Sequence, residues 1–140
     1  MKNKNIVILV CVVCLSLCIG CMLLYFSSVQ QNKILINPSQ SYLSHFDIQD
    51  GHVYFYCTLT IENHTSFPQY ISMAALFSND VDNGLLKNPL CDGYSQFNDS
   101  KVFLLQEGEN ILNVVFVGLH NGGTQKHDRT LPEIQISLLP

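Results

Sequence analysis

An uninterrupted apolar segment near the N-terminus constrains this chain more than any other feature. Residues 6–26 contain no charged side chain. As a helix rising about 1.5 Å per residue, the segment is roughly 31 Å long, which matches a bilayer hydrocarbon core of about 30 Å. In lipid, a single apolar segment must satisfy its own backbone hydrogen bonds, so it is helical there. We therefore expect a membrane helix or a signal sequence.

The flanking charges predict the orientation of this segment. Lys2 and Lys4 precede it, and Lys33 is the one base in the 15–20 residues or so that follow, which places the N-terminus in the cytoplasm. The segment exceeds the usual signal-peptide core of about 7–15 residues, and no clear small-x-small cleavage site follows it. The sequence favours an uncleaved signal anchor at residues 6–26, with a cytoplasmic tip at residues 1–5 and the remainder extracytoplasmic at the cell membrane.

A second motif offers an alternative to the anchor. Cys18-Ile19-Gly20-Cys21 resembles the lipobox of bacterial lipoproteins, which implies acylation of Cys21. The sequence departs from that pattern at Cys18, where leucine is usual, and in the apolar residues that follow the motif instead of a polar tether. Lipidation and ordinary cleavage remain alternatives. Either an anchor or a lipid would tether the exported part to the outer face of a membrane.

Four cysteines of this segment have the spacing C-x2-C-x3-C-x2-C, at Cys11, Cys14, Cys18 and Cys21. In a soluble chain such spacing suggests zinc or iron–sulfur ligation. A helix in lipid instead holds the four sulfurs in a line, within an arc of roughly 80° at about 100° per residue. We expect no metal or cofactor here. The stripe is either a surface for self-association or for packing on a partner helix, or plain lipid-facing residues.

The two remaining cysteines, Cys57 and Cys91, fall in the exported part, where an oxidising compartment permits a disulfide. Closing that loop would contribute roughly 3–4 kcal/mol on the chain-entropy model. Two unrelated thiols are the alternative, and the sequence leaves both open.

Composition and charge exclude several function classes. The chain is 47% hydrophobic and only 13% charged, which argues against a disordered chain. The exported part carries five Lys and Arg against eleven Asp and Glu, a net charge of 5 − 11 = −6, which disfavours nucleic acid and anionic lipid as partners. The nucleophile, metalloprotease and phosphate-loop motifs of enzymes do not occur in the sequence, so we do not expect an enzyme.

Beyond a polar stalk at residues 27–41, short β-branched and aromatic segments alternate with turns, which predicts an all-β domain at residues 42–140. The expected strands are residues 42–48, 52–63, 70–77, 101–106, 111–119 and 131–139, with a short edge strand allowed at Ile34-Leu35-Ile36. Asp50-Gly51 predicts a tight turn. Ser78 to Gly84 is expected to form one helical turn, residues 87–100 a loop, and Glu107-Gly108-Glu109-Asn110 a hairpin connection. Six or seven strands predict an immunoglobulin-like antiparallel sandwich, preceded by one transmembrane helix.

The strand that ends in Leu59-Thr60-Ile61-Glu62-Asn63-His64-Thr65, preceded by an anchor and a polar stalk, carries a family resemblance. In these features the chain resembles small uncharacterised membrane-anchored or lipoprotein immunoglobulin-like domains of Gram-positive bacteria. The resemblance covers about residues 42–139, and it implies a binding or scaffold module outside the membrane. It supplies no functional residues.

The strand at residues 52–63 provides the first candidate binding residues. Its apolar positions alternate with Tyr54, Tyr56, Thr58 and Thr60, and tyrosines on a polar sheet face provide contact area at low entropic cost. We therefore expect these four residues to contact a partner, most plausibly another envelope protein. A face covered by the stalk or by another strand is the alternative.

Two polar segments provide weaker candidates. His120, His127 and Arg129 belong to a glycine-containing loop that could contact a partner or could simply connect two strands. Asp80, Asp82 and Asn83 suggest a calcium loop, but glycine and the closing glutamate are out of register, and a turn explains these residues without a ligand. A metal-binding or redox-responsive envelope domain, using this loop or Cys57 and Cys91, is the alternative to a binding module.

Overall fold

The computed structural model of the 140-residue chain describes residues 11–22, 33–123 and 130–140. The chain divides into two compact units, Met1–Asn32 and Lys33–Pro140. Each unit is described by itself.

The described part of the first unit is a helix at residues 11–22, and all twelve of its residues are exposed. Cys11, Cys14, Cys18 and Cys21 therefore lie along one helix, as their spacing predicts. Within the described ranges, none of the helices combines the length and the apolarity needed to cross a membrane. The predicted span at residues 6–26 extends beyond those ranges at both ends.

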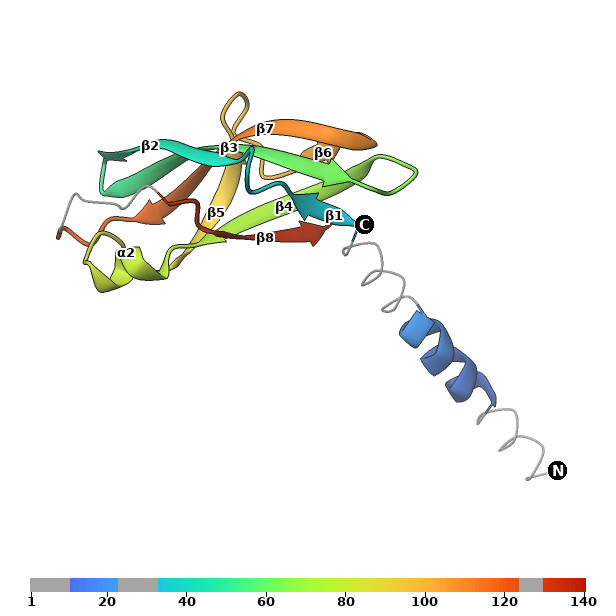
Figure 1. Ribbon diagram of the computed structural model, residues 1–140. Helices are drawn as coiled ribbons and strands as arrows, with labels where there is room; N and C mark the ends of the chain where they lie inside the picture. The colour runs from blue at the N-terminus through green and yellow to red at the C-terminus, as the bar shows by residue number, and fades with distance from the viewer. Residues whose placement is uncertain (1–10, 23–32, 124–129) are drawn as a thin grey trace. The chain divides into compact units, whose positions relative to one another are not determined.

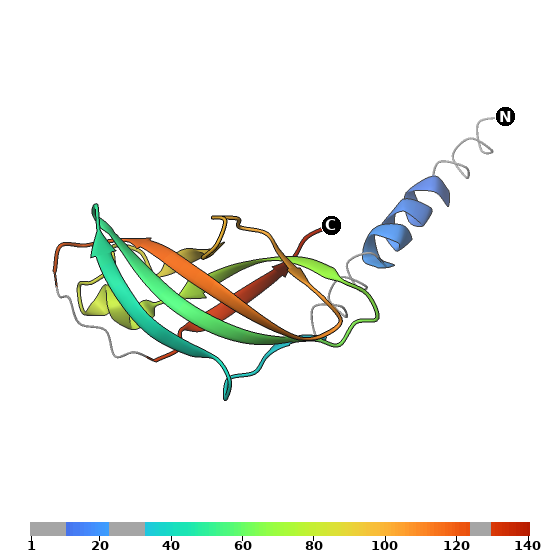
Figure 2. The same cartoon turned by 90° about the horizontal axis from the view of Figure 1, so that it is seen from above.

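The second unit is a curled antiparallel sheet of eight strands (Figures 1 and 2). The strands are β1 (Ile34–Ile36), β2 (Tyr42–Gln49), β3 (His52–Asn63), β4 (Gln69–Leu76), β5 (Leu90–Ser95), β6 (Phe103–Leu105), β7 (Gly108–Leu119) and β8 (Glu133–Leu138). One short helix, α2 (Ser78–Asp82), follows β4.

Two long strands organise the two halves of this sheet. β3 pairs with β7 along its whole length and with β1 and β2 on its other edge. β4 pairs with β8 on one edge and with β5 and β6 on the other. β5 joins the halves, because its first residues pair with β4 and its last residues pair with β7. This change of partner within one strand is how the sheet curls over its own core.

Alternation of side chains along the strands builds that core. The inward residues of β3 are Val53, Phe55, Cys57, Leu59 and Ile61, and all are buried. They pack with inward residues of β4 and β7, such as Ile71 and Phe116. Phe77 stacks on Phe55 at 4.0 Å between ring centroids, so aromatic contacts join the two halves at the end where α2 begins.

Several predictions of local structure are confirmed. The strands expected at residues 42–48, 52–63, 70–77, 111–119 and 131–139 are present to within three residues at each end. Asp50 and Gly51 have φ values of 50° and 74°, the left-handed pair that a type I′ hairpin turn requires. Ile34–Ile36 is an edge strand on β3, so the folded unit begins ahead of the residues assigned to the sandwich.

Two topological predictions are wrong. Residues 87–100 were expected to form a loop, but they contain β5. The glycine that suggested a loop, Gly93, is instead required by close packing within the strand. A Cβ atom there would lie 2.9 Å from a Phe116 ring carbon and 3.0 Å from the Met73 carbonyl oxygen. The hairpin expected across residues 107–110 does not form either, since β6 pairs with β4 while β7 pairs with β3 and β5. The sheet accordingly has eight strands, where six or seven were expected.

Candidate partner-binding face

One face of the sheet collects aromatic side chains from three strands. Tyr54 and Tyr56 point away from the core, because they alternate with the buried residues of β3. Residues opposite each other in an antiparallel pair share a face, so the register adds neighbours from β2, β7 and β5. We name as the outer tyrosine face the side chains Tyr42, His45, Tyr54, Tyr56 and Tyr94.

The cross-strand register arranges this face in rows. His45 lies opposite Tyr56, which lies opposite Val115, which in turn lies opposite Tyr94. The rings of His45 and Tyr56 stack with centroids 4.4 Å apart and planes 10° apart. A second row, parallel to the first, joins Asp47, Tyr54, Val117 and Asp92 in the same way. Aromatic and β-branched residues thus form a continuous surface across four strands.

The edge of the outer tyrosine face next to β5 is fixed by one lysine. The Lys101 ammonium lies 2.8 Å from a carboxylate oxygen of Asp92 and 5.0 Å from the centre of the Tyr94 ring. The hydrogen bonds that Lys101 makes to Asp92 and Tyr94 raise the pKa of its ammonium. Because this ion pair is exposed on both sides, its contribution to stability is small. Its effect is to place one cation and one anion at the rim of the aromatic surface.

The other end of the outer tyrosine face is more apolar and more open. Tyr42 lies opposite Thr58 and is 55% exposed, while Ile111 lies opposite Thr60 and is 65% exposed. The Thr58 hydroxyl donates a hydrogen bond to the Asn113 side-chain oxygen at 3.2 Å. Large exposed apolar groups beside satisfied polar groups are typical of protein interfaces.

Thr60 corrects the predicted set of binding residues. Its backbone N–H donates to the Ser41 hydroxyl at 3.0 Å, and its own hydroxyl donates to the Gln40 carbonyl at 3.3 Å. The β1–β2 connection therefore covers Thr60, which is buried. The alternative expected from the sequence, a face covered by the stalk, holds for this one position. Tyr54, Tyr56 and Thr58 remain partly exposed.

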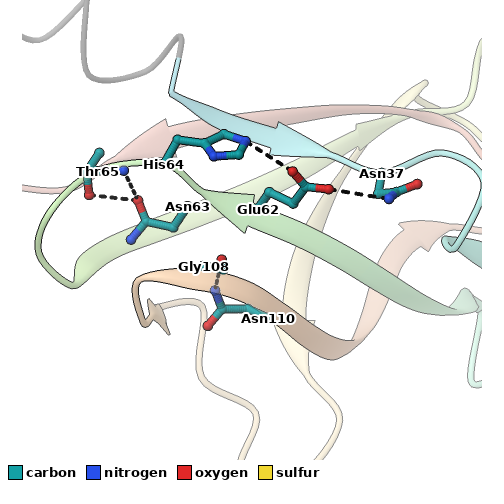
Figure 3. A network of polar contacts seen from close by, with 7 residues as sticks. All are labelled: Asn37, Glu62, Asn63, His64, Thr65, Gly108 and Asn110. Atoms are coloured by element: carbon teal, nitrogen blue, oxygen red, sulfur yellow. Dashed lines mark hydrogen bonds and ion pairs between the residues drawn. The ribbon is translucent and has the colours of Figure 1, made fainter.

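A polar network closes the sheet at the end where β3 stops (Figure 3). Glu62 accepts a hydrogen bond from the Asn37 amide at 3.4 Å, and its other carboxylate oxygen lies 3.0 Å from His64 Nε2. Glu109 lies directly opposite Glu62 on β7. Like charges in opposite positions repel, and the contact with His64 offsets that repulsion whenever the imidazole is protonated.

Asn63, in the same network, has a structural role. Its side chain is 1% exposed, and its oxygen accepts hydrogen bonds from the Thr65 backbone N–H at 3.0 Å and the Thr65 hydroxyl at 2.7 Å. Its amide donates to the Phe67 carbonyl at 3.2 Å. Asn63-His64-Thr65 is a glycosylation sequence by pattern, but this amide is buried and bonded on both sides. The second such sequence begins at Asn98, which is exposed.

Of the predicted loop residues, the structure describes His120, which does not join the outer tyrosine face. His120 follows β7 at the opposite end from the network, where its backbone N–H donates to the Gly51 carbonyl at 2.9 Å. Its Nε2 atom is buried and has no hydrogen-bond partner among the described residues. His127 and Arg129 lie outside the described residues.

Cys57 and Cys91 are two separate buried thiols. Cys57 lies opposite Val114 on β7, whereas a Cβ atom at Gly118 would lie only 2.7 Å from the Cys91 sulfur. Four residues of strand separate those two positions on β7, which is about 13 Å. Burial raises the pKa of the Cys57 thiol to about 12. Burial raises the pKa of Cys91 to about 12 as well, with smaller contributions from the nearby Asp80 and Asp92 charges. Both therefore stay protonated and poorly nucleophilic at neutral pH.

The acidic loop does not assemble a metal site. Asp80 is buried at α2 and accepts a hydrogen bond from the Asn83 amide at 3.3 Å, whereas Asp82 is exposed. Across residues 11–22, 33–123 and 130–140, no group of three or more His, Cys, Asp and Glu side chains is placed to hold a metal ion. The acylation predicted at Cys21, on the helix of the first unit, stays a prediction.

A small cleft lies beside α2. Its volume is about 170 Å³, and it is lined by residues 76–80 and 130–133. Sites for small molecules usually measure about 300–1,000 Å³, so this cleft is below the size that a drug-sized ligand needs. The outer tyrosine face is therefore the stronger candidate for recognition.

Sequence reasoning found the β3 members of this face and missed the others. His45 was hidden by a β-bulge between Leu43 and His45, which shifts the register of β2. Tyr94 was hidden because its strand was assigned to a loop. The period-two pattern within β5, where buried Cys91 and Gly93 alternate with Asp92 and Tyr94, was the available signal.

Comparisons with protein-family models, with curated proteins and with solved structures find no match to this chain.

Proposed function

We propose that this chain is a membrane-anchored, extracytoplasmic binding module that holds another envelope protein on its outer tyrosine face. The observation that carries the proposal is the gathering of five aromatic side chains, from β2, β3 and β5, on one outward face of the sheet. In this proposal the protein acts by binding and not by catalysis.

The anchoring part of the proposal rests on the N-terminal segment. An uncharged apolar run at residues 6–26 has the length of a bilayer core, and its described portion is helical with every side chain exposed. An exposed apolar helix needs an apolar environment, and lipid supplies it. The basic residues before the segment favour export of the domain that follows.

We also propose that the domain has an immunoglobulin-like architecture, which fits a binding module. Counted from β2, the neighbours β2-β3-β7 match the order A-B-E of one sheet of that fold, and the pair β4-β8 matches C-F of the other. Such sandwiches commonly present a binding surface on a rigid scaffold. Here the scaffold is the continuous β3–β7 pair beneath the aromatic residues.

The outer tyrosine face has the chemistry of a protein interface. Tyrosine side chains provide large contact areas, lose little entropy when ordered and keep a hydroxyl for hydrogen bonding. Tyr42 and Ile111 supply exposed apolar area at one end, and Asp92 with Lys101 supplies charge at the rim. An apolar centre with a polar rim is how specific interfaces are usually built.

Photo-crosslinking in cells that produce the protein tests this proposal. We would replace Tyr56 or Tyr54 with the photoreactive analogue p-benzoylphenylalanine, which preserves an aromatic ring on the sheet. The matched control is the same replacement at Gln135, an exposed residue on the outer side of β8. We expect a discrete crosslinked protein at the two tyrosine positions and none at Gln135. The same products at all three positions, or none at any, would refute the assignment of this face.

A further inference from the structure

A second exposed apolar surface lies at one end of the domain. Phe67, in the β3–β4 loop, is 49% exposed; Tyr70 on β4 is 54% exposed; and Leu104 on β6 is 42% exposed. Tyr70 and Leu104 lie opposite each other in the sheet. We name these three residues the tether-end patch. Figures 1 and 2 show the β3–β4 loop, β6 and β1 at the same end of the sheet.

The connection to the N-terminal segment reaches the domain at this same end. The Lys33 carbonyl, just before β1, accepts a hydrogen bond from the His64 backbone N–H at 2.9 Å. His64 begins the loop that contains Phe67. The first residue of the folded unit is therefore fixed to the loop that carries part of the patch.

The length of the connecting chain limits how far this end can be from a membrane. Six residues, 27–32, separate the end of the predicted span from Lys33. Fully extended, six residues reach at most about 20 Å. If residues 6–26 span a bilayer, as the proposed function states, Lys33 is held within about that distance of the lipid surface, and the tether-end patch lies at the same end of the domain as Lys33.

The chemistry of the patch suits a lipid surface. Tyrosine is enriched at membrane–water interfaces, where its ring meets apolar chains and its hydroxyl meets water. Phenylalanine and leucine insert their side chains into the acyl boundary. Glu107, on the nearby β6–β7 connection, and Glu109, on β7, outnumber Lys33 at this end and would repel anionic headgroups, so the surface that fits is zwitterionic.

We propose that the domain rests its tether-end patch, Phe67, Tyr70 and Leu104, on the zwitterionic surface of the bilayer that its own N-terminal segment spans. This inference rests on the proposed anchor. The contact sets the orientation of the domain: the strand end faces the lipid, and the outer tyrosine face stays lateral and accessible. The chain thereby presents its partner-binding residues at a defined height above the membrane.

The absence of tryptophan from the sequence makes the contact measurable. A single introduced tryptophan is then the only one in the full chain. We would reconstitute Phe67→Trp in phosphatidylcholine vesicles with and without brominated acyl chains, which quench tryptophan on contact. Leu90→Trp is the matched control, because Leu90 is 53% exposed at the opposite end of the domain. Leu104→Trp is a second probe of the patch in case Phe67→Trp does not fold.

We expect brominated lipid to lower the emission of Phe67→Trp and Leu104→Trp about twofold, and to leave Leu90→Trp unchanged, because only the first two contact the interface. Vesicle flotation, run in parallel, separates this inference from the proposed function. Variants that float with the vesicles and show equal quenching at both ends, or none, would overturn the lipid contact alone. A chain that fails to float would overturn the anchor, and the contact with it.

Discussion

Replacing Asn63 with alanine tests whether the polar network at the end of β3 stabilises the fold. Asn63 is 1% exposed and bonds to the backbone and hydroxyl of Thr65 and to the Phe67 carbonyl. After substitution, the single proton of the Thr65 hydroxyl can be donated to the Phe67 carbonyl oxygen, which lies 2.7 Å from the hydroxyl oxygen. The Thr65 backbone N–H, however, loses its partner inside the protein.

The magnitude follows from that single orphaned donor. An unsatisfied buried N–H costs about 1–3 kcal/mol, and the lost amide donation to Phe67 adds roughly 0.5–1.5 kcal/mol. We therefore expect Asn63→Ala to lower the free energy of unfolding by about 1.5–4.5 kcal/mol. For a domain of this size, each kcal/mol lost lowers the melting temperature by about 4–8 °C.

Urea unfolding of the domain at residues 33–140, followed by circular dichroism, measures this loss. The matched control is Asn98→Ala, which removes the first asparagine of the other Asn-x-Ser/Thr sequence. Asn98 is exposed and accepts one hydrogen bond, from the Ser100 N–H at 3.2 Å. We expect that control to change stability by less than about 0.5 kcal/mol. Equal losses in the two variants, or no loss in Asn63→Ala, would refute the structural role of Asn63.

Three further predictions concern packing and charge. Burial raises the pKa values of the Cys57 and Cys91 thiols from the ordinary 9.0 to about 12. The folded state therefore binds more protons between these values, and stability falls as pH rises through that window. Cys57→Ala should reduce the slope of unfolding free energy against pH in that window, measured by urea unfolding, and an unchanged slope would contradict this. Gly118→Ala places a Cβ atom 2.7 Å from the Cys91 sulfur and should destabilise the domain by about 1–3 kcal/mol, which unchanged urea midpoints would contradict. Lys101→Ala removes an exposed ion pair with Asp92 and should leave the urea midpoint unchanged. A lowered midpoint would show that the pair is not solvent-screened.

Strand positions were predictable from the sequence where alternation was regular. Both ends of β3 match the prediction, because five apolar side chains alternate with four polar or amphipathic ones and the turn at Asp50-Gly51 fixes the start of the strand. β8 was recognised from the same pattern in Ile134, Ile136 and Leu138. Period-two alternation reports which face is buried, and this information is local.

Strand pairing was not predictable, because it depends on contacts between distant segments. β5 contains a glycine that is selected by contact with Phe116 and Met73, residues far from it in sequence. β6 contains three residues, too few to specify a partner, and it pairs with β4 instead of its neighbour in sequence. For the same reason, only part of the candidate site was predictable from the sequence. Tyr54 and Tyr56 belong to a strand with regular alternation, whereas His45 and Tyr94 join them only through strand pairing in the folded domain.

The mass of the membrane-extracted chain, together with protease digestion of intact cells, tests whether the domain is anchored outside the cell. We expect a full-length chain of 15.8 kDa whose residues 33–140 are digested from outside as readily as in lysed cells. A chain that begins at an acylated Cys21 would replace the proposed anchor by a lipid. A domain digested only after lysis would refute the proposed extracytoplasmic location.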